Sequence, residues 1–173
     1  LVPGIVAGEV YFSIGMSEPD SGSDLASIRS SARKVDGGYI VNGTKVWTSQ
    51  AHNNHYFIVL VRTTPVDEAQ GRHNGMSQFV LDLRSPGVEI RPIRLLSGHH
   101  HFNEVVMTDV FVADHMLLGV EGNGWAQVIG ELAFERSGPE RILSTYPLLA
   151  ALVDAVGPDP SAEAAAELGT LVA

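Results

Sequence analysis

Cysteine is absent from all 173 residues, which excludes disulfide bonds, thiol catalysis and cysteine-ligated zinc or iron–sulfur sites. Charge is also scarce, because only 18% of residues are charged, and 11 basic residues face 20 acidic ones. The resulting net charge of −9 argues against nucleic acids and anionic membrane surfaces as partners. No apolar run approaches the roughly 20 residues of a membrane-spanning helix, so we expect no membrane partner.

The chain also lacks an initiator methionine, and no charged-then-apolar leader opens it. We therefore interpret it as a piece of a longer protein, with the cytoplasm as the expected location. Its length fits one ordinary domain, or one domain with part of another. Hydrophobic residues make up 45% of the sequence, which is enough for a buried core and excludes wholesale disorder.

The chain from residue 9 to about residue 116 carries the signals of a β-domain with many short strands. The triplet at 36–38 predicts the turn of a hairpin, and the pair Asn42-Gly43 predicts a second tight turn. Strands are expected at residues 9–16, 28–35, 39–41, 56–61, 77–83, 88–93 and 105–112.

After residue 123 the pattern becomes helical. A wide apolar stripe at helical spacing predicts a first helix, and its members are Trp125, Val128, Ile129, Leu132, Ala133 and Arg136. A second helix is expected at 143–156, with Pro147 as a kink or restart point, and a third follows Ser161 as its N-cap. The apolar faces of these helices need partners that this sequence does not supply.

Two segments carry residues suited to ligand binding, and each has a structural alternative. Residues 17–24 follow a strand and are rich in Gly, Ser and Asp, which suits a backbone nest for a pyrophosphate or an ordinary polar turn. Residues 42–49 place Trp47 before two hydroxyl residues. That arrangement suits a planar heteroaromatic ring or a tryptophan packed in the core.

Together these segments resemble the acyl-CoA dehydrogenase family. The shared motifs are Ser-Glu-Pro-x-x-Gly-Ser-Asp at 17–24, Gly-x-Lys-x-Trp-Thr-Ser at 43–49, Arg-Thr at 62–63, Ser-Pro-Gly-Val at 85–88, Phe-Asn-Glu-Val at 102–105, Gly-Trp at 124–125 and Phe-Glu-Arg at 134–136.

The resemblance implies a fold that is mainly β and then α. It places the family's middle β-barrel domain, which binds flavin and acyl-CoA, at residues 9–118. Residues 1–8 would be the end of an N-terminal helical part or a linker, and residues 119–173 would begin an incomplete C-terminal helical bundle.

The resemblance also implies FAD as the cofactor. By similarity, the residues along the flavin and its pyrophosphate would be Ile14, Met16, Ser17, Gly22, Ser23, Trp47, Thr48 and Ser49. Groups at Met16 and Ser17 would face the pyrimidine edge of the flavin ring, and Trp47 would pack on the ring. Hydrogen bonds at the ring edges tune how well a flavin accepts a hydride.

The implied reaction is α,β-dehydrogenation of an acyl-CoA thioester, the chemistry of fatty acid β-oxidation. A carboxylate removes the α-proton while the β-hydride passes to the flavin. Many family members place this base further into the C-terminal domain, whereas a minority use a Glu directly before an Arg. Glu135 with Arg136 resembles that pair, and its apolar neighbours favour partial burial, so Glu135 is a candidate base. The alternative is an exposed or salt-bridged helix residue, and the later pair Glu140-Arg141 is expected to be surface charge.

Substrate contacts by similarity are assigned to Ser23, Phe134, Glu135 and Arg136, with a core role as the alternative for Phe134. The implied partners are the acyl-CoA, an electron-transferring flavoprotein as electron acceptor, and further copies of the full-length protein in a tetramer or dimer. The departure of residues 137–141 from the fatty-acid members leaves branched, terpenoid or steroid side-chain thioesters open.

The run at 99–101 is three histidines, but successive side chains on a strand alternate between its faces, so no metal site is expected. Three alternative functions remain. One is a non-catalytic truncated module that binds a full-length partner, and the others are an acyl-CoA oxidase and a flavin monooxygenase relative. The chain by itself is expected to be inactive.

Overall fold

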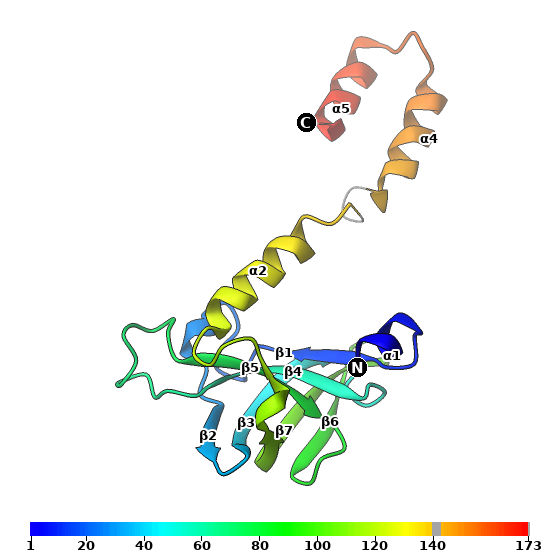
Figure 1. The fold of residues 1–173 in the computed structure, drawn as a ribbon. Coiled ribbons are helices and arrows are strands. Elements are labelled where there is room, and N and C mark those ends of the chain that lie inside the picture. Colours follow the sequence, from blue (N-terminus) through cyan, green and yellow to red (C-terminus); the bar gives the residue numbers. More distant parts are fainter. Residues whose placement is uncertain (140–142, 173) are drawn as a thin grey trace. The chain divides into compact units, whose positions relative to one another are not determined.

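A hairpin within the sheet confirms the predicted turn at 36–38. In the computed structural model, which describes residues 1–139 and 143–172, the turn joins β2 (Ser31–Val35) to β3 (Gly38–Ser49) in antiparallel register (Figure 1). The second turn predicted at Asn42-Gly43 is wrong, because β3 continues through it with a register shift. Gly43 has a φ of +147°, and a Cβ there would lie 2.0 Å from Ser30 Oγ. The close approach of residue 30, not a chain reversal, accounts for the glycine.

The other strands follow the order expected from the sequence, with shifted bounds at several ends, except for the last and shortest strand, which was not predicted. They are β1 (Phe12–Gly15), β4 (Tyr56–Arg62), β5 (Met76–Asp82), β6 (Val88–Arg94), β7 (His100–Ala113) and β8 (Leu117–Leu118). Short helical turns are α1 (Val2–Val6), η1 (Leu25–Ser27) and η2 (Asp114–Met116).

The strands form one mixed sheet in the order β6-β7-β3-β2-β4-β5-β8, with β1 paired parallel to β4. Its two halves are joined between β2 and β4 through a single residue pair, Ser31 with Arg62. Among the described residues β6 and β8 are the unpaired ends of this order, so the expected barrel domain takes the form of an open, curled sheet. The broader expectation of a mainly β part followed by helices is confirmed.

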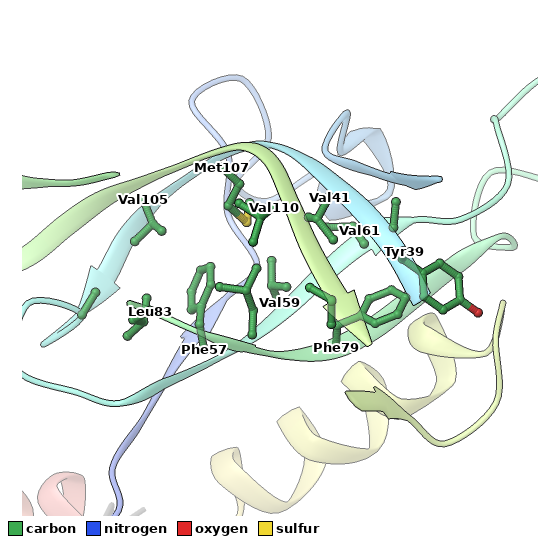
Figure 2. Close-up of a cluster of buried hydrophobic side chains, with 14 residues drawn as sticks. Tyr39, Val41, Phe57, Val59, Val61, Phe79, Leu83, Val105, Met107 and Val110 are labelled. Carbon is green, nitrogen blue, oxygen red and sulfur yellow. The ribbon is translucent and has the colours of Figure 1, made fainter. Parts of the chain in front are cut away.

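The core explains why the sheet curls. In a flat sheet β7 and β5 would lie about 19 Å apart, because strands are spaced about 4.8 Å and three others separate them. Instead, Val110 and Met107 of β7 share one buried cluster with Phe57 of β4 and Phe79 of β5. Figure 2 shows these side chains converging from opposite walls. Burial of this shared apolar surface holds the two halves of the sheet together.

The helical part consists of α2 (Gly124–Arg136), α4 (Tyr146–Val156) and α5 (Ala162–Val172). The second predicted helix therefore starts later than residue 143, with Pro147 in its first turn, where its missing N–H is tolerated. The predicted cap of the third is confirmed, because Ser161 Oγ accepts the Ala164 N–H at 3.2 Å. The pair Glu140-Arg141 lies outside the described residues.

The chain divides into two compact units, Leu1–Val128 and Ile129–Ala173. Within the second unit, α4 and α5 enclose an apolar hollow lined by Thr145, Tyr146, Leu148, Leu149, Leu152, Leu171 and Val172. Over the described part of the chain, none of the helices combines the length and apolarity needed to cross a membrane.

Candidate functional site

Trp47 lies on a bulge in β3. Lys45 pairs with Val105 of β7 and Thr48 with Asn103, so β3 carries one extra residue over this stretch. Trp47 itself has a φ of +60°, a left-handed conformation that bulky residues rarely adopt. Bulges re-aim side chains, and here the Trp47 side chain is 58% exposed, with its ring edge-on to Phe102 at 6.0 Å. The bulge therefore presents a flat aromatic face outside the core.

A surface hollow of about 320 Å³ adjoins this tryptophan. Its lining residues come from β1, β3 and the segment after β3, and they are Phe12, Ser13, Ile14, Trp47, Ser49, Gln50 and Asn54. Ser13 Oγ donates to the Ser49 carbonyl at 2.7 Å, and Asn54 Nδ2 donates to the Phe12 carbonyl at 2.9 Å. The predicted residues Ile14, Trp47 and Ser49 thus meet in one place.

Sequence reasoning missed Ser13, Gln50 and Asn54 as lining residues. Ser13 and Asn54 are hydrogen-bonded to each other at 2.9 Å. No local signal could have found this contact, because it depends on the pairing of β1 with β4, whose first register pair is Phe12 with Tyr56.

The turn after β1 carries the other predicted cofactor residues. Ser17 accepts the Val46 N–H at its carbonyl (2.9 Å), and Met16 accepts Lys45 Nζ at its carbonyl (3.0 Å). Both residues are partly buried against β3 by these contacts. Gly22 and Ser23 are exposed, and the space around the missing Cβ of Gly22 is open. The turn is thus held against β3 at Met16 and Ser17, and it is accessible to solvent at Gly22 and Ser23.

A buried ion pair supports this turn from inside. Lys45 Nζ lies 2.8 Å from Glu18 Oε1, and the side chains are only 0% and 7% exposed. Glu18 also accepts the backbone N–H groups of Arg29 (2.7 Å) and Ser30 (3.0 Å).

Burial alone would raise the pKa of Glu18, but the Lys45 charge and the N–H donors lower that pKa overall. Burial outweighs the Glu18 charge at Lys45 and lowers the pKa of the lysine to about 8. Both residues lie inside the recognised motifs, but no local pattern indicates that they pair.

Thr48 is placed differently from its predicted neighbours. Its side chain is fully buried, does not line the hollow, and its Oγ1 has no hydrogen-bond partner within the described part of the chain. The Thr48 carbonyl accepts Asn103 Nδ2 at 3.0 Å. In this structure the contact of Thr48 with Asn103 is therefore made by its backbone carbonyl and not by its side chain.

The predicted substrate residues Phe134, Glu135 and Arg136 belong to α2 in the second unit. All three are exposed, and Phe134 reaches 85%. The partial burial expected for Glu135 is therefore wrong for this chain, because its neighbours Ala133 and Phe134 are exposed as well and only Leu132 is half-buried. Residues 1–139 and 143–172 contain no cluster of His, Cys, Asp and Glu able to hold a metal ion.

Comparison with known proteins assigns this arrangement to a family. The family model described as "Acyl-CoA dehydrogenase, middle domain" matches residues 13–110, which contain the turn and every residue that lines the hollow except Phe12. The chain belongs to the acyl-CoA dehydrogenase family, as the motifs indicated.

Individual relatives agree with this assignment. The chain is 43% identical over 135 residues to the acyl-CoA dehydrogenase FadE34 of Mycobacterium tuberculosis, covering 78% of this chain and 19% of that protein. Among solved structures, the Tcur3481-Tcur3483 steroid ACAD matches with a TM-score of 0.78 at 28% identity, covering 90% of this chain and 40% of that one. The ChsE4-ChsE5 complex of M. tuberculosis matches with a TM-score of 0.70 at 34% identity, covering 77% and 33%. The chain thus spans between a fifth and two-fifths of these relatives.

Proposed function

We propose that this chain supplies the FAD- and acyl-CoA-binding part of an enzyme that dehydrogenates an acyl-CoA thioester between its α and β carbons. Residues 9–118 would be its flavin- and acyl-CoA-binding domain, and residues 119–173 would begin its helical domain. The observation that carries the proposal is the strained bulge that exposes Trp47 beside the hollow. Backbone strain of this kind concentrates at functional sites.

The residues present fit a flavin dinucleotide. Trp47 and Ile14 are 58% and 54% exposed and offer apolar surface for a planar ring. Ser49 adds a hydroxyl at the same hollow, while the open space at Gly22 admits a phosphate close to the backbone. When bound, FAD would supply the ring that accepts the hydride.

The chain's own residues have separate tasks in this proposal. Lys45 holds the Met16 carbonyl and so fixes the backbone that would face the pyrimidine edge. Ser23 would contact both the cofactor and the acyl-CoA. Glu135 would take the α-proton onto its carboxylate, with Arg136 orienting it and Phe134 lining the acyl channel. The Glu135 assignment rests on its place before Arg136 in the Phe-Glu-Arg motif.

The proposed partners are those of a complete enzyme. They are the acyl-CoA, an electron-transferring flavoprotein and further copies of the protein, in the cytoplasm. Among acyl-CoA substrates we favour branched, terpenoid or steroid side-chain thioesters, because a structural relative is described as a steroid ACAD.

Titration of the 173-residue chain with FAD tests the binding half of the proposal. A Trp125→Phe background leaves Trp47 as the one tryptophan, and its emission reports the bound ring. We expect quenching with a Kd between about 1 and 100 µM, weak because the helical domain is incomplete. Trp47→Ala in the original background, followed by flavin fluorescence, should weaken binding at least about tenfold.

Trp125→Phe, followed by the same flavin signal, is the matched control and should bind FAD like the original chain. Equal affinity of the Trp47→Ala and control variants would remove Trp47 from the site. No binding by either background would contradict the proposal and support a non-catalytic module.

The catalytic half is tested in the complete flavin-loaded enzyme. Anaerobic addition of a panel of acyl-CoAs should bleach the flavin absorption with one substrate class, and Glu135→Gln should slow this step about a hundredfold. Glu131→Gln, one helical turn earlier, is the control. Unchanged bleaching in Glu135→Gln would move the base elsewhere, and rapid peroxide formation in air would identify an oxidase.

A further inference from the structure

Asn103 lies at the centre of a side-chain cluster behind the Trp47 bulge. It is fully buried on β7 and is the register partner of Thr48. Its Nδ2 donates to the Thr48 carbonyl at 3.0 Å, and its Oδ1 lies 2.8 Å from His100 Nε2 and 3.2 Å from His52 Nδ1. The two imidazole rings stack with centroids 3.9 Å apart.

The direction of each hydrogen bond follows from the chemistry of the groups. A backbone carbonyl only accepts, so the end of Asn103 that faces Thr48 must be its NH₂ group. The opposite end is then the oxygen, which only accepts. His52 Nδ1 and His100 Nε2 must therefore both carry protons and donate to it.

The remaining nitrogen of His52 is also accounted for. Asn53 Nδ2 lies 3.0 Å from His52 Nε2 and donates to Gln50 Oε1 at 2.7 Å. Since an amide NH₂ is a donor, His52 Nε2 accepts from Asn53, and the ring is the neutral Nδ1–H tautomer. Gln50 lines the hollow, so the cluster ends at the same surface as Trp47.

We propose that Asn103 is a positioning residue for the Trp47 bulge, and that His52 and His100 fix the orientation of its amide. A flipped amide would set its oxygen against the Thr48 carbonyl and its NH₂ against two N–H donors. The Thr48 carbonyl and the Nδ1–H of His52, which Asn53 fixes independently, therefore allow one amide orientation, and the His100 donor reinforces it beside the strained Trp47. The consequence for a bound flavin rests on the proposed function, whereas the orientation itself does not.

The neighbouring titratable groups take no part in the hydrogen bonds that Asn103 makes with Thr48, His52 and His100. Arg94 is the register partner of His100 on β6, and Arg91 of the same strand pairs with Glu104 at 3.1 Å. His55, further along the chain from His52, accepts the Tyr11 N–H at Nδ1. The cluster thus works through hydrogen-bond direction, not through an ion pair.

Nitrogen-15 NMR of the histidines in the flavin-free chain tests the assignment directly. At pH about 8 we expect His52 protonated at Nδ1 only and His100 protonated at Nε2. A His52 ring protonated only at Nε2, or a His100 ring protonated only at Nδ1, would overturn the proposal. Because no flavin is present, failure here is separate from failure of the proposed function.

Variants of His100 separate donation from ring packing. In the Trp125→Phe background, His100→Phe keeps an aromatic ring but loses the donor, and it should shift Trp47 emission and raise its quenching by acrylamide. His100→Gln restores an N–H donor and should return both signals toward the original. His99→Gln is the matched control, because His99 bonds Ser97 in the neighbouring turn.

The effect on cofactor affinity is the last readout. If FAD binds the chain, His100→Phe should raise its Kd about tenfold, whereas His100→Gln should not. Identical Trp47 signals in the His100→Phe variant, the His99→Gln variant and the original chain would overturn the proposal. Failure of His100→Gln to recover the signals would assign His100 to ring packing, which equally contradicts it.

Discussion

The two units of this chain differ in how they use apolar side chains. The unit up to Val128 buries its strands around one shared core and also buries the Lys45–Glu18 ion pair. In the described part of the other unit no residue is buried, although α4 and α5 are rich in leucine, valine and alanine. The apolar faces of the strands are thus buried against one another within the chain. The helical pattern shows only that a helix face is apolar, and burial of that face needs a packing partner.

Removal of a large aromatic side chain should give the largest contrast between the units. Phe57 is fully buried in the core, so Phe57→Ala should lower the free energy of unfolding by about 3–5 kcal/mol. Phe134 is 85% exposed, and Phe134→Ala should change it by less than about 0.5 kcal/mol. Urea denaturation followed by circular dichroism measures both. Similar losses would show that Phe134 is packed in solution.

Breaking the buried ion pair should have the next largest effect. Lys45→Met leaves the Glu18 carboxylate buried without its cation, which should cost roughly 3–5 kcal/mol. The double variant Glu18→Gln with Lys45→Met should recover part of that loss. Arg91→Met breaks only exposed pairs with Glu89 and Glu104 and should cost little. A denaturation series in which Lys45→Met and Arg91→Met behave alike would refute this contrast.

The same pair predicts a pH dependence confined to the β unit. Burial lowers the pKa of Lys45 to about 8, against an ordinary value of 10.5. Between these values the unfolded chain binds more protons than the folded chain, so the stability relative to the double variant should rise with pH. On the acid side the lowered pKa of Glu18 predicts a loss of stability as the pH falls below 4.5 and through that lowered value. The free energy of unfolding of the original chain and of the double variant is measured from pH 8 to 10.5. Parallel curves would argue against a buried, charged lysine.

Two glycines of α2 should give the smallest and most local contrast. A Cβ on Gly124 would lie 2.8 Å from the Met76 carbonyl oxygen, so Gly124→Ala should cost about 1–3 kcal/mol. Gly130 has open space around it, and Gly130→Ala should stabilise the helix by about 0.5–1 kcal/mol. Thermal unfolding of both variants checks the opposite signs. A loss of thermal stability in Gly130→Ala would mean that this face of α2 is covered in solution.

Much of the fold was predictable because its signals are local. The turn at 36–38, the apolar run of β4 and the Ser161 cap each depend on a few neighbouring residues. Predictions were wrong where contacts with distant segments determine the local structure. The pair Asn42-Gly43 predicts a turn when the approach of Ser30 is not known. The strand β7 extends back to His100 because β3 pairs with it as far as Phe102 and β6 as far as His100.

The candidate site shows the same division. Trp47, Ser49 and Ile14 were predicted from the family resemblance, and the structure brings them to one hollow. The roles of Thr48 and Asn103 were not predictable, since the hydrogen bond between them joins residues 55 positions apart.

The sequence by itself determined the family, the succession of strands and helices, and the residue types at the proposed flavin site, because motifs, periodicity and turn chemistry are properties of short segments. Only the tertiary structure decided that the sheet curls without closing, that Lys45 meets Glu18, and that a bulge aims Trp47 outward. Each of these depends on the register between strands far apart in the chain. Register is set when the whole core packs, so no single segment encodes it.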